Sequence, residues 1–291
     1  MPLEPVPLGP IKAVAALVET DAWLLDLLDG ISLDEWDRET IVRGWRVRHV
    51  AGHLLDTALR RLSIVRDGFG AEGPTSGSAE DVRTFVDRVN AEGVAVYGRL
   101  SPRVLRAQMA DAATALHEHL RQLDPHAPAK FAVSWAGETA SPNWFDTARE
   151  LTERWHHQQQ IRLALDRPGI ITRAMYHPVL DCFVRVLPHA YRSVEAPSGT
   201  HVEFQVSGDA GGSWHLLRTG EGWRLFAIED DPSDEEPAPR PVPTARITVP
   251  EDAAWRLFTK ALPNEEAERV IVIEGDRTLA APALGATAIV G

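Results

Sequence analysis

Apolar residues recur at three- and four-residue spacing over most of the first 190 positions, which is the pattern of amphipathic helices. One such segment covers residues 11–31 and ends near Gly30, and another covers residues 45–70 and ends at Gly68 and Gly70. Further helices are predicted over residues 79–100, 102–123 and 143–166. Several long helices in succession predict a four-helix bundle.

Helix start signals support these limits. Ser78 precedes an acidic first turn, Pro102 suits the first position of a helix, and Asn143 can cap the helix that follows it. Residues 125–142 hold several Pro, Ser and Gly residues and are predicted to form a long connection. One more short apolar helix is expected within residues 175–192.

After residue 200 the pattern changes to short alternating runs, which predict strands joined by hairpin turns over residues 201–206, 213–219 and 222–228. An acidic, proline-rich linker is predicted at residues 229–243. A strand, a helix and a second strand are then expected over residues 245–249, 251–262 and 269–275. The sequence therefore predicts an α+β multidomain protein, with a helical bundle over residues 8–190 and a small α+β domain over residues 200–291.

Composition and charge narrow the classes of partner. The chain has 44% hydrophobic and 25% charged residues, and no run approaches the roughly 18 apolar residues of a membrane span. Its first twenty residues lack the basic start and apolar core of a signal peptide, so a cytoplasmic protein is expected. A net charge of -12 disfavours nucleic acid as a partner. Small molecules are the expected partners, and whether the chain is a monomer or a homodimer is left open.

Glu153 and His157 are the first candidates for metal ligands, because residues four apart on a helix share one face and can chelate one ion. His53 lies beside the apolar stripe of another predicted helix, and a bundle can bring it to the same ion. The chain has one cysteine, so a metal must be held by nitrogen and oxygen atoms. Two histidines and a carboxylate are a ligand set of catalytic zinc with an open fourth position.

Other interpretations compete for these residues. Spacing of this kind also occurs on solvated helix faces, and a histidine on a core-facing helix is often only a hydrogen-bonded core residue. His49 is one turn before His53 and can replace it as a ligand. His156 is next to His157 but projects about 100° away around the helix, so both cannot readily face one ion. Asp56 and Arg60 follow His53 by one and two turns and are interpreted as surface residues that could also orient a substrate.

Two segments resemble the signatures of a known family. The segment GWRVRHVAGHLLD is similar to the Trp and His-Leu signature of mycothiol-dependent maleylpyruvate isomerase-like proteins, which belong to the DinB-like superfamily, and ARELTERWHHQQQIRLAL is similar to their second signature. The C-terminal segment GDRTLAAPALGATAIVG resembles the sterol carrier protein-like domain attached to many of them. By position, the resemblance gives His53, Glu153 and His157 the metal-ligand places. It gives Trp45 and Trp155 the aromatic places and Arg149 the place of the family's arginine.

The resemblance implies a zinc-like divalent metal and mycothiol, or a similar low-molecular-weight thiol, as cosubstrate of a cis-trans isomerase. An S-transferase is the nearest enzymatic alternative, and a noncatalytic metal-binding regulatory protein is the alternative from another class. Cys182 lies in an apolar run and is interpreted as a core residue, so an external thiol is expected. Gln160 stands where the family often has an aspartate, and an amide there is expected to support the ligand histidine more weakly.

Overall fold

Two compact units make up the chain in a computed structural model that describes residues 6–76, 78–227 and 242–289. The helical unit comprises Lys12–Ala132 and Ala140–Ile170, and the sheet unit comprises the residues up to Ile11, Val133–Thr139 and Ile171–Ile289. The chain is therefore a multidomain α+β protein in which a helical bundle is followed by an α+β unit, as predicted.

The limits of the units differ from the predicted domain limits of 8–190 and 200–291. Helices α7 (Arg173–Phe183) and α8 (Leu187–Ala190) belong to the sheet unit. Tyr176 of α7 fixes this assignment, because its hydroxyl donates to the Glu251 carbonyl and accepts from the Trp255 amide. Apolar periodicity identifies a helix but not the element against which it packs. Most of the predicted linker at residues 229–243 lies outside the described residues.

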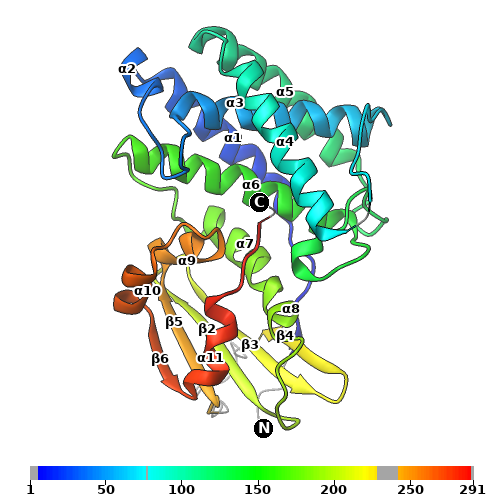
Figure 1. Ribbon diagram of the computed structural model, residues 1–291, viewed down its shortest axis with the longest axis vertical. Coiled ribbons are helices and arrows are strands. Elements are labelled where there is room, and N and C mark those ends of the chain that lie inside the picture. Colours follow the sequence, from blue (N-terminus) through cyan, green and yellow to red (C-terminus); the bar gives the residue numbers. More distant parts are fainter. Residues whose placement is uncertain (1–5, 77, 228–241, 290–291) are drawn as a thin grey trace, which may run out of the picture. The chain divides into compact units, whose positions relative to one another are not determined.

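Four helices, α1, α5, α3 and α6, pack in a ring that forms the bundle. Their apolar stripes meet in a core that includes the fully buried Leu17, Leu54, Leu116 and Leu151. Helix α4 packs on the outer side of α3 (Figure 1). A short helix that the sequence did not predict, α2, follows the first long one. The helices are α1 (Ala13–Asp29), α2 (Leu33–Trp36), α3 (Val47–Arg61), α4 (Ala79–Tyr97), α5 (Pro102–Gln122) and α6 (Asn143–Ala164).

Helices α3 and α4 approach closely at two glycines. A Cβ added to Gly52 would lie 3.2 Å from the Tyr97 Cβ, and one added to Gly93 would lie 2.4 Å from the Asp56 carboxyl group. Gly93 therefore leaves the space that the Asp56 side chain occupies.

The helix ends follow the sequence signals with one exception. After α3, a π-helical turn over Leu62–Arg66 continues the helix almost to the predicted stop at Gly68, which has a φ of 70°. The Ser78 hydroxyl accepts from the Asp81 amide, and Pro102 occupies the first turn of α5, as predicted. Asn143 was predicted to cap α6, but Pro142 holds the N-cap position. The Asn143 side chain instead donates to the Asp124 carbonyl, because a non-local acceptor lies within its reach.

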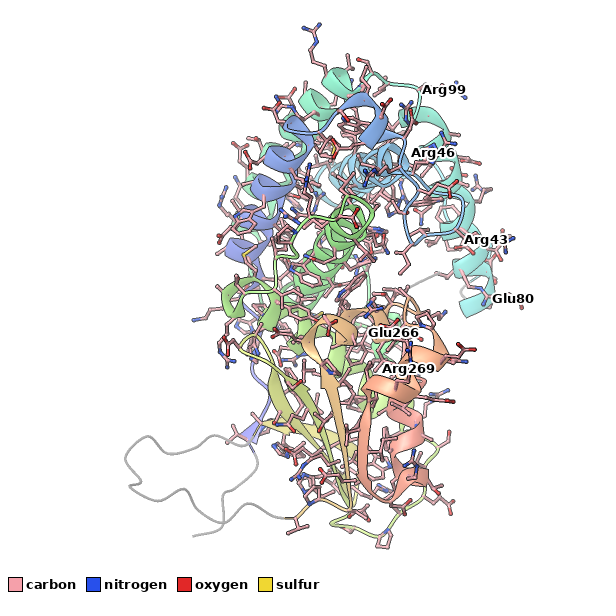
Figure 2. The ribbon with its side chains drawn as sticks, turned by 90° about the vertical axis from the view of Figure 1, so that its left-hand side faces the viewer. Arg43, Arg46, Glu80, Arg99, Glu266 and Arg269 are labelled. Atoms are coloured by element: carbon pink, nitrogen blue, oxygen red, sulfur yellow. The ribbon has the colours of Figure 1, made fainter. Side chains whose placement is uncertain are left out.

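The sheet unit contains a six-stranded sheet in the order β1-β4-β3-β2-β5-β6. All neighbouring strands are antiparallel except β2 and β5. Helices α7, α9 (Glu251–Phe258) and α11 (Arg277–Leu284) complete its core, in which the rings of Phe183 and Phe204 pack on Phe258. Helix α10 (Asn264–Val270), where Figure 2 labels Glu266 and Arg269, was not predicted. The strands are β1 (Val6–Pro7), β2 (His201–Ser207), β3 (Gly212–Thr219), β4 (Gly222–Ala227), β5 (Ala245–Pro250) and β6 (Val272–Gly275).

Among the described residues, every helix is too short or too polar to cross a membrane.

Candidate metal centre

The three side chains predicted to bind a metal meet inside the helical unit. His53 is on α3, and Glu153 and His157 are one turn apart on α6. One ligand atom of each lies within 4.8 Å of the others. The Glu153 Oε1 atom is 2.9 Å from Nε2 of His53 and 3.2 Å from Nε2 of His157. We call this group the His–Glu–His cluster; elsewhere in the described ranges no other three His, Cys, Asp or Glu side chains converge in this way.

Burial and charge set the protonation states in this cluster. Burial raises the pKa of Glu153, but His157 and His53 more than offset this effect, and the net pKa lies well below the usual value. Burial lowers the pKa of His53, only partly opposed by its hydrogen bond to Glu153. An ionised carboxylate beside a neutral imidazole is the state in which both groups bind a cation.

His157 is held through both nitrogens of its ring. Its Nδ1 lies 2.7 Å from Oε1 of Gln160, so that Nδ1–H donates to the amide oxygen, and its Nε2 lies 3.2 Å from Oε1 of Glu153. Gln160 therefore orients this ring as an outer-shell group does at metal sites. The Nδ1 of His53 is buried and has no hydrogen-bond partner within the described residues.

The two alternative histidines have other roles. The Nδ1 of His156 donates to the Thr152 carbonyl at 2.7 Å, and burial lowers the pKa of His156 to about 3, so the ring stays neutral. His49 accepts a hydrogen bond from the Arg46 amide at 3.1 Å at the start of α3, where Figure 2 labels Arg46. Neither ring belongs to the His–Glu–His cluster.

The two tryptophans of the predicted signatures lie in different environments. The Trp45 ring stacks on His157 with ring centroids 6.3 Å apart, and it lies 5.1 Å from the ring of His53. Trp155 is completely buried and donates its indole N–H to the Ile170 carbonyl. Trp45 is thus part of the site, whereas Trp155 belongs to the core.

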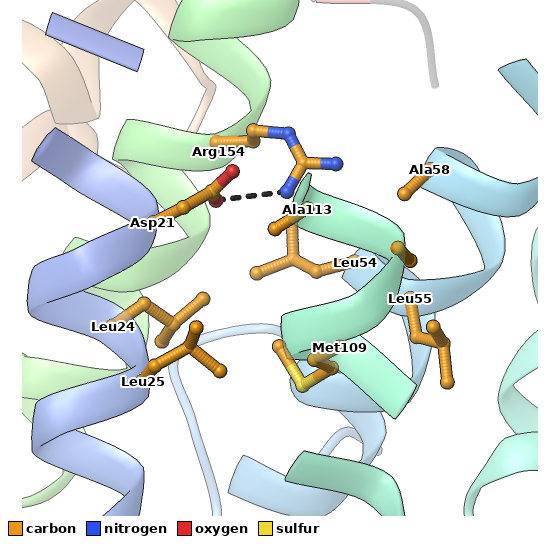
Figure 3. Close-up of a pocket in the computed structure, with 10 residues that line it drawn as sticks. Asp21, Leu24, Leu25, Leu54, Leu55, Ala58, Met109, Ala113 and Arg154 are labelled. Atoms are coloured by element: carbon orange, nitrogen blue, oxygen red, sulfur yellow. Dashed lines mark hydrogen bonds and ion pairs between the residues drawn. The ribbon is translucent and has the colours of Figure 1, made fainter. Parts of the chain in front are cut away.

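Beside the cluster, the interior of the bundle contains ionised residues that the sequence interpretation missed. Asp21 of α1 accepts from Arg154 at 2.8 Å (Figure 3). Asp21 also contacts His117 of α5 at 2.7 Å. Arg154 also donates to Glu150 at 3.1 Å. The adjoining cavity measures only about 10 Å³, roughly the space of one water molecule. It is too small for a substrate, so these residues serve the structure of the bundle.

The fold and the site define a class of protein with two units, in which the helical bundle carries two histidines and a glutamate that can bind a metal ion. The model of the mycothiol maleylpyruvate isomerase N-terminal domain family matches residues 17–162, and the chain belongs to this family. This confirms the resemblance seen in the two sequence signatures.

Relatives and solved structures agree with this membership. Uncharacterised proteins from two strains of Mycobacterium tuberculosis, CDC 1551 and H37Rv, are each 31% identical to the chain over 209 residues, which is 70% of this chain and 76% of theirs. A crystal structure of a histidine-to-alanine mutant of the mycothiol-dependent maleylpyruvate isomerase matches with a TM-score of 0.53 at 13% identity. The match covers 92% of this chain and 93% of that one, and it shows that the fold is shared.

Proposed function

We propose that the protein is a metal-dependent enzyme that uses mycothiol, or a similar small thiol, to isomerise or conjugate a small electrophile. The observation that carries the proposal is the His–Glu–His cluster, in which three ligand atoms lie within 4.8 Å of one another in a bundle of this family.

The cluster suits a divalent ion of the zinc type. Two ligand atoms that are each about 2.0–2.2 Å from one ion lie at most about 4.4 Å apart. The separations of 2.9 Å and 3.2 Å between the Glu153 oxygen and the two imidazole nitrogens are within this limit, and the ligand atoms of the two histidines lie within 4.8 Å of each other. His53, Glu153 and His157 would hold the ion, which when bound lowers the pKa of a thiol so that it reacts as a thiolate at neutral pH.

The chain's own residues prepare this site. Gln160 fixes the His157 ring, and Trp45 covers both histidines and limits their contact with water. Cys182, the one cysteine of the chain, is completely buried in α7, so the reacting thiol must be supplied from outside.

In the isomerisation we propose, the sulfur of the thiolate bonds to one carbon of a cis alkene, and the electron pair moves onto the conjugated carbonyl. Rotation about the resulting single bond follows. The electron pair then returns, the C–S bond breaks, and the trans alkene and the thiolate are released. An S-transferase would stop after the C–S bond has formed and a proton has been taken up.

A noncatalytic metal-binding protein is the alternative from another class, in which the same three residues only stabilise the bundle. The partial exposure of Glu153, at 27% of its side chain, favours the catalytic function, because a purely structural ion is normally enclosed.

The test is an assay of zinc-loaded protein for cis-trans isomerisation of maleylpyruvate and for thiol conjugation, with and without mycothiol. We expect turnover that requires the thiol and that is lost in Glu153→Ala. Arg106→Gln, on the exposed side of α5, is the matched control and keeps full turnover. Absence of both reactions in protein with full metal content would favour the noncatalytic alternative.

A further inference from the structure

We propose that Gln160 adjusts the charge of the metal site in favour of an anionic ligand. Its amide holds the ring of His157 without adding a negative charge, so a bound ion attracts a thiolate more strongly than it would with a carboxylate at this position. The inference rests on the proposed function, in which the thiolate is that ligand. Gln160 acts through His157 and is therefore a positioning residue.

Gln160 and Glu153 contact opposite nitrogens of the His157 ring. Gln160 follows His157 by three residues on α6, which is almost one full turn. Its Oε1 atom lies 2.7 Å from Nδ1 of His157, whereas Nε2 of that ring lies 3.2 Å from Glu153. The Gln160 side chain is buried. A charge placed here would be poorly screened by water and separated from a bound ion by one imidazole ring.

The second histidine of the cluster has no anionic support from behind either. The Nδ1 atom of His53 is buried and makes no hydrogen bond within the described residues. Histidine ligands usually donate this second N–H to a carboxylate, a carbonyl or a water, and a carboxylate makes the ring a stronger donor to the metal. Glu153 is therefore the one source of negative charge in the His–Glu–His cluster.

This donor set leaves excess positive charge at the site. As metal ligands the two imidazoles are neutral, and the ionised Glu153 offsets one of the two positive charges of a divalent ion. A carboxylate in place of Gln160 would offset much of the rest, which favours binding of the cation and opposes binding of an anion to it. The amide has the reverse effect, so the metal is held less tightly and a thiolate at the open position more tightly.

A purely orienting role for Gln160 leads to a different expectation. An amide oxygen and a carboxylate oxygen both accept from the Nδ1–H of His157, so Gln160→Glu would keep the ring in place and change neither affinity. An electrostatic role changes the affinity for the metal and the affinity for a metal-bound anion in opposite directions. The signs of the two changes therefore separate the two roles.

The experiment measures both affinities in cobalt-loaded protein at about pH 8, where a glutamate is ionised. Competition with a chromophoric chelator gives the affinity for Co²⁺, and the visible absorption of bound Co²⁺ follows a titration with thiocyanate, a small anion that tests the open position. We expect Gln160→Glu to bind Co²⁺ about tenfold more tightly than wild type and thiocyanate at least about threefold more weakly. Arg106→Gln, on the exposed side of α5, is the matched control and should equal wild type in both affinities.

Gln160→Asp carries the same charge on a shorter side chain. It should change both affinities in the same directions as Gln160→Glu, and it decides the question if Gln160→Glu does not fold. Changes of equal sign in the two affinities, or no change in either, overturn the proposed role of Gln160. Opposite changes in a protein without thiol-dependent turnover would preserve this role and refute the proposed function. Thiol-dependent turnover of wild type together with unchanged affinities in Gln160→Glu would do the reverse.

Discussion

Gln160 is the residue at which the structure adds most to the sequence interpretation of the cluster. An amide is expected to support His157 more weakly than an aspartate, and its oxygen lies 2.7 Å from Nδ1, where it accepts a hydrogen bond and holds the ring with Nε2 facing Glu153. An amide oxygen accepts from a neutral N–H as a carboxylate does, but it adds no negative charge.

We predict that Gln160→Leu weakens zinc binding about 10–100-fold, because the Nδ1–H of His157 loses its acceptor and the ring its orientation. Gln160→Glu keeps an acceptor and should bind zinc at least as tightly as wild type. Competition titration with a chromophoric chelator measures both. Equal affinities in Gln160→Leu and wild type would show that the hydrogen bond has no orienting role.

Local spacing along one helix was enough to predict some site residues but not those that depend on contacts between helices. Glu153 and His157 share one helix face, and the 100° rotation per residue separates His156 from them. The pairing of His53 with α6 is non-local, and family resemblance supplied it. Asp21 was missed, although it interrupts the apolar stripe between Leu17 and Leu24, and such an interruption is a signal of a buried polar contact.

At the scale of elements, buried ion pairs connect the helices of the bundle. Asp21 joins α1 to α5 and α6 through His117 and Arg154, and Arg61 joins α3 to α6 through Asp146. Removing one partner of such a pair leaves an uncompensated charge in the interior.

We predict that Asp21→Asn lowers the free energy of unfolding by about 3 kcal/mol or more. The comparison is Arg106→Gln, which breaks the exposed α1–α5 pair with Asp29 and should cost less than about 1 kcal/mol. Urea denaturation of both variants measures the difference. Similar losses in the two would contradict a special role for the buried pair.

These buried ion pairs also determine how the free energy of unfolding of the bundle should change at acidic pH. Burial raises the pKa values of Asp21 and Asp146, but Arg154 and His117 around the first, and Arg149 and Arg61 around the second, lower both below the usual carboxyl value. Because the folded pKa values are depressed, their stabilisation is complete above the unfolded value of about 4 and is lost as pH falls through the folded values.

We therefore expect the contribution of these two carboxylates to be constant from pH 7 to pH 5 and to fall below about pH 4. Asp21→Asn should show a smaller decrease in that acidic range than wild type. Unfolding free energies at several pH values test this. A decrease between pH 7 and pH 5 that Asp21→Asn abolishes would reverse the assigned direction.

Long periodic helices were predictable as elements because their own residues encode the apolar face, as in α1, α5 and α6. Short elements were not: α2 and α10 have about two turns or fewer and carry little periodic signal. The place of α7 in the sheet unit depends on contacts of Tyr176 with residues about 75 positions away along the chain, which no local pattern contains.

For the whole molecule, the central distinction is between a thiol supplied by the protein and a thiol supplied from outside. Cys182 is completely buried in the sheet unit, whereas the His–Glu–His cluster lies in the helical unit. The partial exposure of Glu153 and the burial of the cysteine both favour an external thiol.

We predict that Cys182→Ser leaves thiol-dependent turnover within about twofold of wild type, although a buried hydroxyl can cost about 1–3 kcal/mol of stability. The assay compares folded wild-type and variant protein with and without mycothiol. Thiol-independent turnover that disappears in the serine variant would identify Cys182 as the nucleophile.

The metal content of the purified protein tests the central claim most directly. After zinc loading and gel filtration, elemental analysis should find about one ion per chain in wild type and in His156→Ala, and much less in His53→Ala and His157→Ala, since each of these loses a ligand. Full zinc content in the His53 and His157 variants, or selective loss in His156→Ala, would contradict the assignment of His53, Glu153 and His157 as the metal ligands.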